Sequence, residues 1–331
     1  MSEGHGHLWG VILAGGNGER LQGFIKRLYG RNLPKQYCAI TGTRSLLQHT
    51  LDRAKLLIPK ERVLTLVAQE HSRYVAQQLA DQPPETIIIQ PCSRETGPAL
   101  FLSLLQILRR DPSSTVAVFP SDHFIKEELR FIGYVAGAAS FVQSHPDRLV
   151  MLGVKPERIE SGYGYIERGE VTARYGTKEF HRVVKFWEKP DSAEATALHS
   201  QDCLWNTLIL IGRGATFMKH IRAQMPEVVK PFEVMDAAFN FRHEQEFVQN
   251  VFPSLPTVNF SRAVLEQIPD HLCVMEMDDV YWNDWGEECR IKRDVERFKL
   301  RERSGLAQLG KEELWTDEPK RDSLFTNGRT K

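Results

Sequence analysis

The chain has 331 residues, of which 41% are apolar and 26% charged, the composition of an ordinary globular protein with a sizeable core. Lysine and arginine together number 43, as do aspartate and glutamate, so the formal net charge is zero. This balance argues against a nucleic-acid-binding protein, which normally carries a basic excess, and no apolar stretch reaches the ~20 residues of a transmembrane helix.

The cysteines and the N-terminus give an expectation about location. The five cysteines form no C-x-x-C pair, which predicts free thiols in a reducing compartment. The segment MSEGHGHLWG has neither the basic region nor the long apolar region of a secretory signal. We therefore expect a cytoplasmic protein. The sequence leaves the oligomeric state open, a homodimer included.

Short apolar segments alternate with amphipathic segments in the first half of the chain. The predicted strands are 9–14, 62–68, 86–91, 114–120 and 148–154. The predicted helices between them are 45–58, 71–80, 96–110 and 129–144, and Ser45 is placed to cap the first. This alternation, with continuous apolar strands, predicts an α/β fold: a Rossmann-like mixed, mostly parallel sheet with helices on both faces.

The pattern changes near Pro156. Segments 162–171, 180–190 and 203–212 are predicted to be strands, the first two longer and alternating, and 213–224 has the apolar spacing of a helix. The chain then becomes polar, and EECRIKRDVERFKLRERSG predicts a solvated helix. We therefore expect one folded unit over residues 1–290, followed by a charged helix and tail over 291–331.

Three polar loops stand at the carboxyl ends of three of the predicted strands. Ligands of open α/β sheets bind at the carboxyl ends of the strands. They are GGNGER, PCSRET and SDH. Gly15, Gly16 and Gly18 would let backbone N–H groups converge on phosphate oxygens, with Arg20 adding positive charge. The first loop is no P-loop, and Leu21 stands where a Rossmann fingerprint has its third glycine. Taken alone, it fits an ordinary tight turn equally well.

Further motifs along the chain indicate a function for this loop. LAGGNGERL is followed by LPKQY, PCSRETGPAL, FPSDHFI, SGYGYIERG, FWEKPD, LWNT, FSRAVLEQ and YWNDWGE. In this order they resemble the motifs of the sugar nucleotidyltransferases, most closely the mannose-1-phosphate guanylyltransferase branch. The resemblance covers roughly residues 8 to 290.

The resemblance implies a reaction and a division of the chain. A guanylyl group would pass from GTP to mannose 1-phosphate, giving GDP-mannose and pyrophosphate, with Mg²⁺ as cofactor. Residues 1–290 would be the catalytic domain, with a nucleotide-binding half to about residue 155 and a sugar-binding half after it. Two polyanions must meet in this reaction, so the site needs cations and a metal.

The resemblance also implies which residues act. The catalytic residues would be Arg20, Lys35 and Asp122, and the metal ligands Asp122 and Asp284. The nucleotide would be bound by Leu13, Gly15, Gly16, Gly18, Pro91, Arg94, Glu95 and Thr96. The sugar phosphate would be bound by Gly164, Tyr165, Glu188, Lys189 and Asn206. Two distant carboxylates suit Mg²⁺, which prefers oxygen ligands. We expect a structural role for His123.

Three departures from the family pattern stand out. The span from Arg20 to Lys35 is a few residues longer than usual, and Leu208 follows Trp-Asn-Thr where a glycine is usual. Glu95 replaces the usual asparagine of the base-binding segment. If Glu95 faces the base, its carboxylate favours guanine, which offers two donors, over adenine, which offers an acceptor. If it faces solvent, backbone groups around Gln90 and Pro91 must select the base.

Other functions stay open at this point. One is a pyrophosphorylase for another nucleoside triphosphate and sugar 1-phosphate. Another is a non-catalytic module that binds nucleotide sugars, although the retained charged residues speak against it. A Rossmann dehydrogenase is excluded, because the third glycine is missing and no supported acidic ribose-binding residue follows.

Overall fold

The computed structural model describes residues 6–233 and 241–300. Its strands are β1 (Leu8–Ala14), β2 (Val63–Ala68), β3 (Ile87–Gln90), β4 (Thr115–Pro120), β5 (Phe124–Ile125), β6 (Leu149–Val154), β7 (Tyr165–Tyr175), β8 (Lys178–Trp187), β9 (Leu204–Arg213), β10 (Leu272–Glu276) and β11 (Trp282–Asn283). Its helices are α1 (Gln22–Tyr29), α2 (Leu46–Lys55), α3 (Ser72–Gln78), α4 (Thr96–Arg110), α5 (Glu128–Ser144), α6 (Ser192–Ser200), α7 (Gly214–Gln224), α8 (Pro226–Val229), α9 (Phe241–Val251), α10 (Phe260–Ala263) and α11 (Glu288–Arg297).

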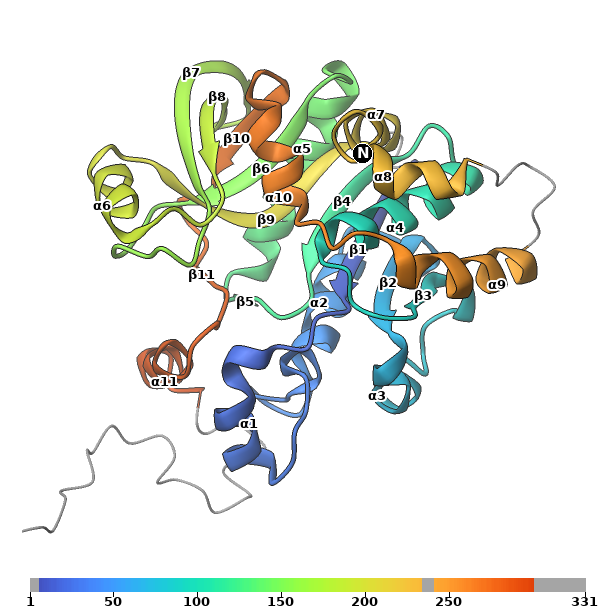
Figure 1. Ribbon diagram of the computed structural model, residues 1–331. Coiled ribbons are helices and arrows are strands. Elements are labelled where there is room, and N and C mark those ends of the chain that lie inside the picture. The colour runs from blue at the N-terminus through green and yellow to red at the C-terminus, as the bar shows by residue number, and fades with distance from the viewer. Residues whose placement is uncertain (1–5, 234–240, 301–331) are drawn as a thin grey trace, which may run out of the picture.

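One mixed sheet forms the centre of the molecule, with strand order β3-β2-β1-β4-β9-β6-β10-β8-β7 (Figure 1). Strands β1 to β4 run parallel, as do β6 and β10. Strand β9 lies antiparallel between β4 and β6, and β7 and β8 form an antiparallel pair at one edge. The predicted α/β class is therefore confirmed. Strands β5 and β11 form a small second sheet.

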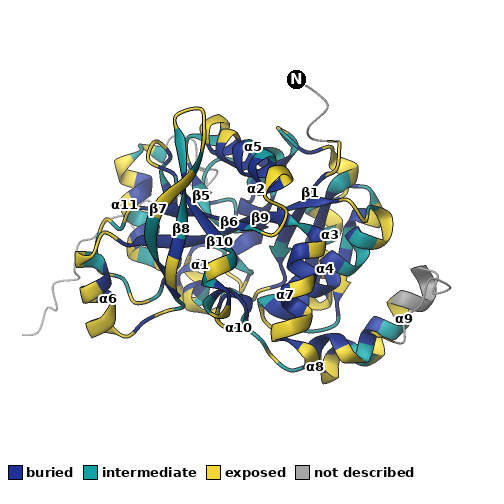
Figure 2. Ribbon diagram, turned by 90° about the horizontal axis from the view of Figure 1, so that it is seen from above, coloured by how far each residue is buried: buried dark blue, intermediate teal, exposed yellow. Residues whose placement is uncertain are grey.

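Helices cover both faces of the large sheet, as predicted. Consecutive residues of β1 enter different cores, since Ile12 packs with α2 and α5 whereas Val11 packs with α4 and α7. Figure 2 shows these helix pairs on opposite sides of the dark, buried strands. Because both faces are covered, the central strands are apolar throughout, which explains their continuous runs in the sequence.

The predicted cap of the first long helix is confirmed. The Ser45 hydroxyl accepts a hydrogen bond from the backbone N–H of Gln48 at 3.2 Å, and the Gln48 side chain accepts one from the N–H of Ser45 at 3.0 Å. This reciprocal capping box satisfies two N–H groups that the first turn of α2 would leave unpaired.

The long span between Arg20 and Lys35 folds into helix α1. Its buried face consists of Phe24, Ile25 and Leu28, and Gly30 ends the helix at φ 70°. The additional residues therefore form an ordered element with its own apolar contacts rather than a loosened loop.

Helix α11 differs from the solvated helix that the sequence predicts. Ile291, Val295 and Arg290 are buried along one face, and Asp294 is fully buried. The Asp294 carboxylate accepts hydrogen bonds from the Trp285 indole N–H at 2.7 Å and from Nδ2 of Asn283 at 2.9 Å. The prediction is wrong for this face because buried charged groups pair here with polar groups of the β11 segment. The predicted tail beyond residue 300 lies outside the described residues.

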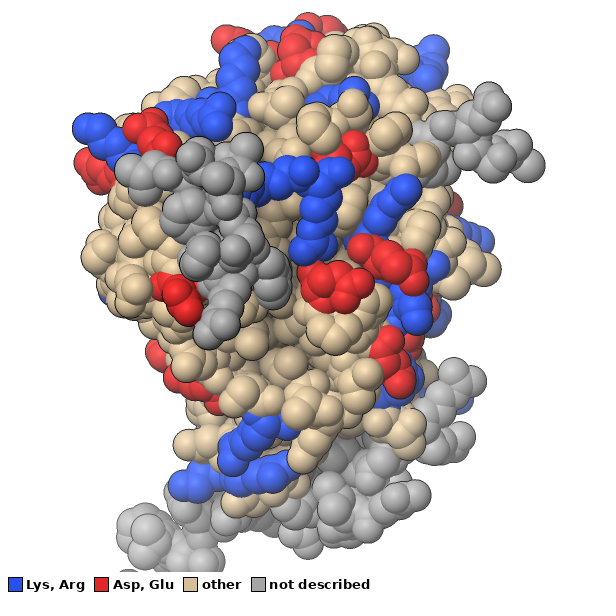
Figure 3. Space-filling view, turned by 90° about the vertical axis from the view of Figure 1, so that its right-hand side faces the viewer, with Lys and Arg blue, Asp and Glu red and all other residues tan. Residues whose placement is uncertain are grey.

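The surface charges and the cysteines agree with the sequence-based expectations. On the face shown in Figure 3, acidic and basic side chains lie interspersed among uncharged ones. All five cysteines are free thiols, as predicted. Within residues 6–233 and 241–300, no helix has the length and apolar character needed to cross a membrane.

Candidate active site

The three polar loops meet at one edge of the sheet and line a pocket of about 520 Å³. Because β1, β3 and β4 are parallel members of one sheet, their carboxyl ends lie on the same side. The predicted residues that line the pocket are Leu13, Gly15, Gly16, Gly18, Arg20, Glu95, Thr96 and Asp122. Gln36, Gln90, His123 and Leu208 also line it.

The glycine loop is shaped by the segment that carries Lys35. Gly18 has φ 60°, and a Cβ at this position would lie 3.1 Å from the Cβ of Lys35. Gln36 donates through Nε2 to the carbonyl oxygens of Ala14 at 2.9 Å and Gly16 at 2.7 Å. Glycine is therefore required at residue 18 by both its backbone conformation and this close contact.

Lys35 joins two parts of the chain that are far apart in sequence. Its side chain is 5% exposed, and Nζ lies 2.9 Å from Oδ2 of Asp122, at the end of β4. The same ammonium donates to the backbone carbonyl of Asp284, which follows β11. Burial raises the pKa of Asp122, but the Lys35 charge and hydrogen bond outweigh it and hold the pKa below its usual range.

Asp284 is held as a buried carboxylate. Its Oδ1 accepts hydrogen bonds from the Tyr163 hydroxyl at 2.5 Å, Arg290 Nη1 at 2.8 Å and the Gly286 N–H at 2.8 Å. Its Oδ2 lies 3.7 Å from Nη2 of Arg20. Burial acts to raise the pKa of Asp284, but Lys35 and the Tyr163 hydrogen bond lower it to about 2. The group is therefore ionised at neutral pH.

His123 has the structural contacts expected of it. Its Nδ1 accepts a hydrogen bond from the Trp282 indole N–H at 3.1 Å, which ties the end of β4 to β11. Burial lowers the pKa of His123 to about 4, even though Asp122 opposes this shift. The imidazole is therefore neutral at neutral pH and adds no charge to the site.

Three of the predicted sugar-binding residues meet where β7, β8 and β9 come together. The carbonyl of Gly164 accepts a hydrogen bond from the N–H of Asn206 at 2.8 Å. A Cβ at residue 164 would lie 2.8 Å from Cζ of Phe186 and 3.1 Å from Oε2 of Glu188. Only glycine fits this close approach. Oδ1 of Asn206 accepts from the N–H of Leu208 at 3.0 Å, so Nδ2 is the amide atom left to contact a ligand.

Glu188 and Lys189 form a charged pair beside this junction. The Glu188 side chain is 9% exposed, and its Oε1 lies 3.8 Å from Nζ of Lys189, which is 54% exposed. Burial raises the pKa of Glu188, Lys189 opposes the shift, and Glu266 adds to it. The N–H of Glu188 donates to the Glu266 carboxylate at 2.6 Å. The pair therefore consists of a buried acceptor and an exposed cation.

Nine predicted residues are not among those that line the pocket. Six of them have been placed above: Lys35, Asp284, Gly164, Glu188, Lys189 and Asn206. The other three are Pro91, Arg94 and Tyr165. Tyr165 is fully buried, and its hydroxyl accepts the N–H of Glu160 at 3.1 Å. Arg94 donates to the backbone carbonyl of Pro253. Neither Arg94 nor Pro91 is among the residues that line the pocket. Their assigned contacts with nucleotide or sugar stay predictions.

Sequence reasoning missed the side chains of several residues of the site, although it had named the backbone around Gln90 as a possible selector of the base. Gln90 is 2% exposed and lines the pocket, and its Oε1 is buried without a hydrogen-bond partner among the described residues. A glutamine that ends an apolar strand was the available signal for it. Tyr163 lay within a recognised motif, whereas Arg290 lay in a charged run that gave no sign of its contact with Asp284.

Leu208 occupies a strained bulge of β9. Residues Asn206 and Leu210 pair with Gly153 and Met151 of β6, so three residues of β9 lie opposite the single Leu152. Leu208 has φ 56°, a left-handed conformation that costs a non-glycine residue roughly 1–2 kcal/mol. The glycine that the family pattern has here would carry no such strain.

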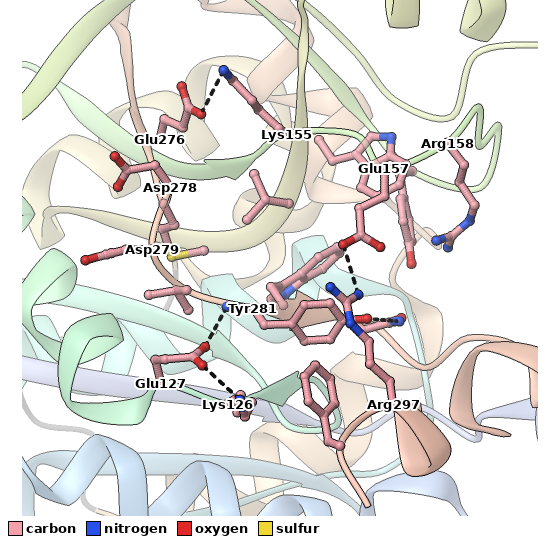
Figure 4. A pocket seen from close by; sticks show the side chains of 18 residues that line it. Lys126, Glu127, Lys155, Glu157, Arg158, Glu276, Asp278, Asp279, Tyr281 and Arg297 are labelled. Carbon is pink, nitrogen blue, oxygen red and sulfur yellow. Dashed lines mark hydrogen bonds and ion pairs between the residues drawn. The ribbon is translucent and has the colours of Figure 1, made fainter. Parts of the chain in front are cut away.

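A second pocket of about 610 Å³ opens where β6 and β10 end (Figure 4). Two ion pairs join residues of its lining: Lys155 lies 3.7 Å from Glu276, and Arg297 lies 3.3 Å from Glu157. Tyr163 lines this pocket and also donates to Asp284. None of the predicted site residues lines it. The first pocket is therefore the candidate active site.

Comparisons with known proteins identify the family of the chain. The sequence profile of the nucleotidyl transferase family matches residues 9–290. The mannose-1-phosphate guanylyltransferase of Escherichia coli strain K12 is 31% identical over 288 residues, covering 84% of this chain and 58% of the relative. The xanthan biosynthesis protein XanB of Xanthomonas campestris pv. campestris strain B100 is 30% identical over 283 residues, covering 83% and 57%. The chain thus spans little more than half the length of these curated relatives.

A solved structure is similar over most of both chains. It is described as a mannose-1-phosphate geranyltransferase from Thermus thermophilus, and it has 25% sequence identity and a TM-score of 0.71. The match covers 87% of this chain and 78% of the other. The likeness therefore extends over most of the fold.

The low pKa of Asp284 predicts a pH-dependent contribution to stability. An unfolded aspartate has a pKa of about 3.9, and folded Asp284 has a pKa of about 2. The stabilisation is therefore fully present above the unfolded pKa and is lost as the pH falls from about 4 towards 2. Urea denaturation measures how far Asp284→Asn lowers the free energy of unfolding relative to the wild type. This loss should be about 1 kcal/mol smaller at pH 3 than at pH 6.

Asp294→Asn is the matched control, because burial raises the pKa of Asp294. Its carboxyl group favours the folded state most at low pH, so the loss caused by this substitution should shrink as the pH rises. An Asp284→Asn loss that is equal at both pH values would contradict the ion-pair account of Asp284.

Proposed function

This chain belongs to the nucleotidyl transferase family, and we propose that it transfers the guanylyl group of GTP to mannose 1-phosphate, giving GDP-mannose and pyrophosphate. The observation that carries the proposal is the contact of buried Lys35 with Asp122 and with the backbone of Asp284, beside a glycine loop. The names of the curated relatives support guanylyl and mannose as the groups involved. The convergence of charges at the pocket favours this enzyme over a non-catalytic binding module.

The fixed cations suit the two anionic substrates. Oxygen of the sugar phosphate would attack the α-phosphate of GTP, and pyrophosphate would leave. Lys35 is buried beside the glycine loop, and Arg20, 62% exposed, lies at the rim next to Asp284. Preorganised cations of this kind stabilise charge that spreads over the phosphate oxygens during transfer. The loop N–H groups would add hydrogen bonds to the same oxygens.

The two aspartates fit a Mg²⁺ ion. No cluster of three or more metal-ligating side chains occurs in residues 6–233 and 241–300, but Mg²⁺ commonly takes one or two carboxylates and completes its shell with phosphates and water. Lys35 contacts Oδ2 of Asp122, and Oδ1 of Asp284 accepts three hydrogen bonds. Oδ1 of Asp122 and Oδ2 of Asp284 would hold the ion. When bound, it would neutralise charge on the phosphates.

The sugar phosphate would bind at the junction of β7, β8 and β9. The Glu188 carboxylate would accept hydrogen bonds from sugar hydroxyls, and Nδ2 of Asn206 would donate one. Gly164 permits the close approach of backbone to this site. Lys189, next to Glu188 and largely exposed, would pair with the phosphate.

We assign base selection to Gln90 rather than to Glu95. Oε1 of Gln90 is a buried acceptor with no partner among the described residues, and guanine offers adjacent N–H donors that would satisfy it. An unpaired buried acceptor costs free energy, so a base without donors at this place would bind poorly. Glu95 lines the pocket but is exposed, where water can solvate its carboxylate.

We propose a division of the chain to match. We take residues 1–290 as the catalytic domain, with its nucleotide-binding half ending near residue 155. In support, the pocket lining comes from residues 13–123 and Leu208, whereas Gly164, Glu188 and Asn206, which we assign to the sugar, come after residue 155. The cytoplasmic location, the homodimer and a separate segment 291–331 stay predictions.

The proposed metal ligands predict a loss of turnover. Asp122→Asn and Asp284→Asn should each lower kcat at least ~10²-fold, as loss of a preorganised electrostatic group does. Pyrophosphate release from GTP and mannose 1-phosphate measures this, and EDTA should abolish it in the wild type. The control Asp52→Asn alters an exposed pair with Arg44 and should retain activity. Full turnover in EDTA, or in both site variants, would refute the assignment.

The proposed base contact predicts a change in nucleotide preference. The wild type should favour GTP over ATP at least ~10-fold in kcat/KM, equivalent to about 1.4 kcal/mol. Gln90→Leu should remove most of this preference, because it replaces the acceptor with an apolar group of similar size. Glu95→Gln should leave it nearly unchanged. Equal use of both nucleotides by the wild type would refute guanylyl transfer, and an unchanged ratio in Gln90→Leu would refute only the role of Gln90.

A further inference from the structure

The bulge at Leu208 is fixed by side-chain hydrogen bonds. Oδ1 of Asn206 accepts the N–H of Leu208 at 3.0 Å. The Thr207 hydroxyl donates to the carbonyl of Leu152 at 2.6 Å and accepts the N–H of Ile209 at 3.4 Å. These bonds hold Leu208 in its left-handed conformation. Bulges of this kind commonly redirect a side chain next to an active site.

Leu208 connects the two halves of the candidate site. Its side chain packs against the apolar core on the α4 face and lines the pocket that also contains Glu95, Thr96 and Asp122. Its backbone N–H binds Asn206, which we place at the sugar. Leu208 is the pocket-lining residue contributed by β9, whereas the other lining residues lie between residues 13 and 123.

We propose that Leu208 determines acceptor specificity, because its side chain lines the nucleotide pocket while its backbone N–H holds Asn206, the residue that we assign to the sugar. Its branched side chain fills space that glycine would leave open. Hexose 1-phosphates whose ring carries only hydroxyl groups fit beside it, and those with a bulky acetamido group on the ring are excluded. The inference rests on the proposed function, because it assumes a sugar 1-phosphate as acceptor.

The strain at Leu208 supports a functional reason for this residue. A strained backbone conformation persists where the surrounding structure enforces it, and such conformations cluster at active sites. Glycine would adopt φ 56° without strain. The chain instead keeps a large apolar side chain at the point where both halves of the site meet.

A matched pair of acceptors tests the proposal. Mannose 1-phosphate and N-acetylmannosamine 1-phosphate differ in one ring substituent, a hydroxyl against an acetamido group. With GTP as donor, Leu208→Gly should lower the ratio of their kcat/KM values at least ~10-fold relative to the wild type, in the range expected for relief of a steric misfit. An unchanged ratio would overturn the proposal.

Stability gives a readout that does not depend on catalysis. Leu208→Gly and Leu208→Ala both lose the packing of the side chain against the core, but only glycine removes the backbone strain, so Leu208→Gly should have the higher thermal unfolding midpoint of the two. Leu13→Gly, in the same pocket lining but within strand β1, should lower the wild-type midpoint by several degrees, on the order expected for ~1 kcal/mol or more. Leu208→Ala keeps the strained backbone and removes most of the side chain. It should widen acceptor use without the gain in stability.

The outcomes separate this inference from the proposed function. If the wild type makes GDP-mannose and Leu208→Gly leaves the acceptor ratio unchanged, the inference fails alone. If the wild type makes no product with mannose 1-phosphate, the proposed function fails and the inference with it. A midpoint of Leu208→Gly that is no higher than that of Leu208→Ala would contradict the strain on which the inference depends.

Discussion

The buried ammonium of Lys35 is the interaction on which the site depends. It contacts the Asp122 carboxylate at 2.9 Å and the backbone carbonyl of Asp284, so it joins the end of β4 to the segment after β11. Removing one member of a buried ion pair leaves an uncompensated charge, which typically costs about 3–5 kcal/mol. Gly18 and Gln36 fit the glycine loop around the same segment. Lys35 therefore links the glycine loop, the Asp122 carboxylate and the backbone of Asp284.

The protein occupies one oxygen of each carboxylate. Lys35 contacts one oxygen of Asp122, and Tyr163 and Arg290 bind one oxygen of Asp284. The other oxygen of Asp284 lies 3.7 Å from Arg20. Each group stays ionised because nearby donors and cations outweigh the effect of burial on its pKa. If these carboxylates hold a metal ion as proposed, little reorganisation would be needed when it binds.

The sequence was informative where local patterns decide structure. Continuous apolar strands and polar loops identified the sheet and the ends of β1, β3 and β4, because strand length and burial are encoded locally. The burial of Arg290 and Asp294 was not predicted, since their partners on the β11 segment meet them only in the folded chain. The buried position of the Tyr165 side chain depends on packing in the same way. The conformation of Leu208 follows from its register against β6, which no run of residues in β9 reveals.

The central claim is that guanylyl transfer to mannose 1-phosphate takes place at the Lys35 site. Incubating the wild type and Lys35→Met with α-phosphate-labelled GTP, mannose 1-phosphate and Mg²⁺, and separating the labelled products, tests it directly. The wild type should convert the label to GDP-mannose, and Lys35→Met, if it unfolds cooperatively, should do so at least ~10²-fold more slowly. Absence of labelled GDP-mannose with the wild type, or equal rates in the two proteins, would contradict the account.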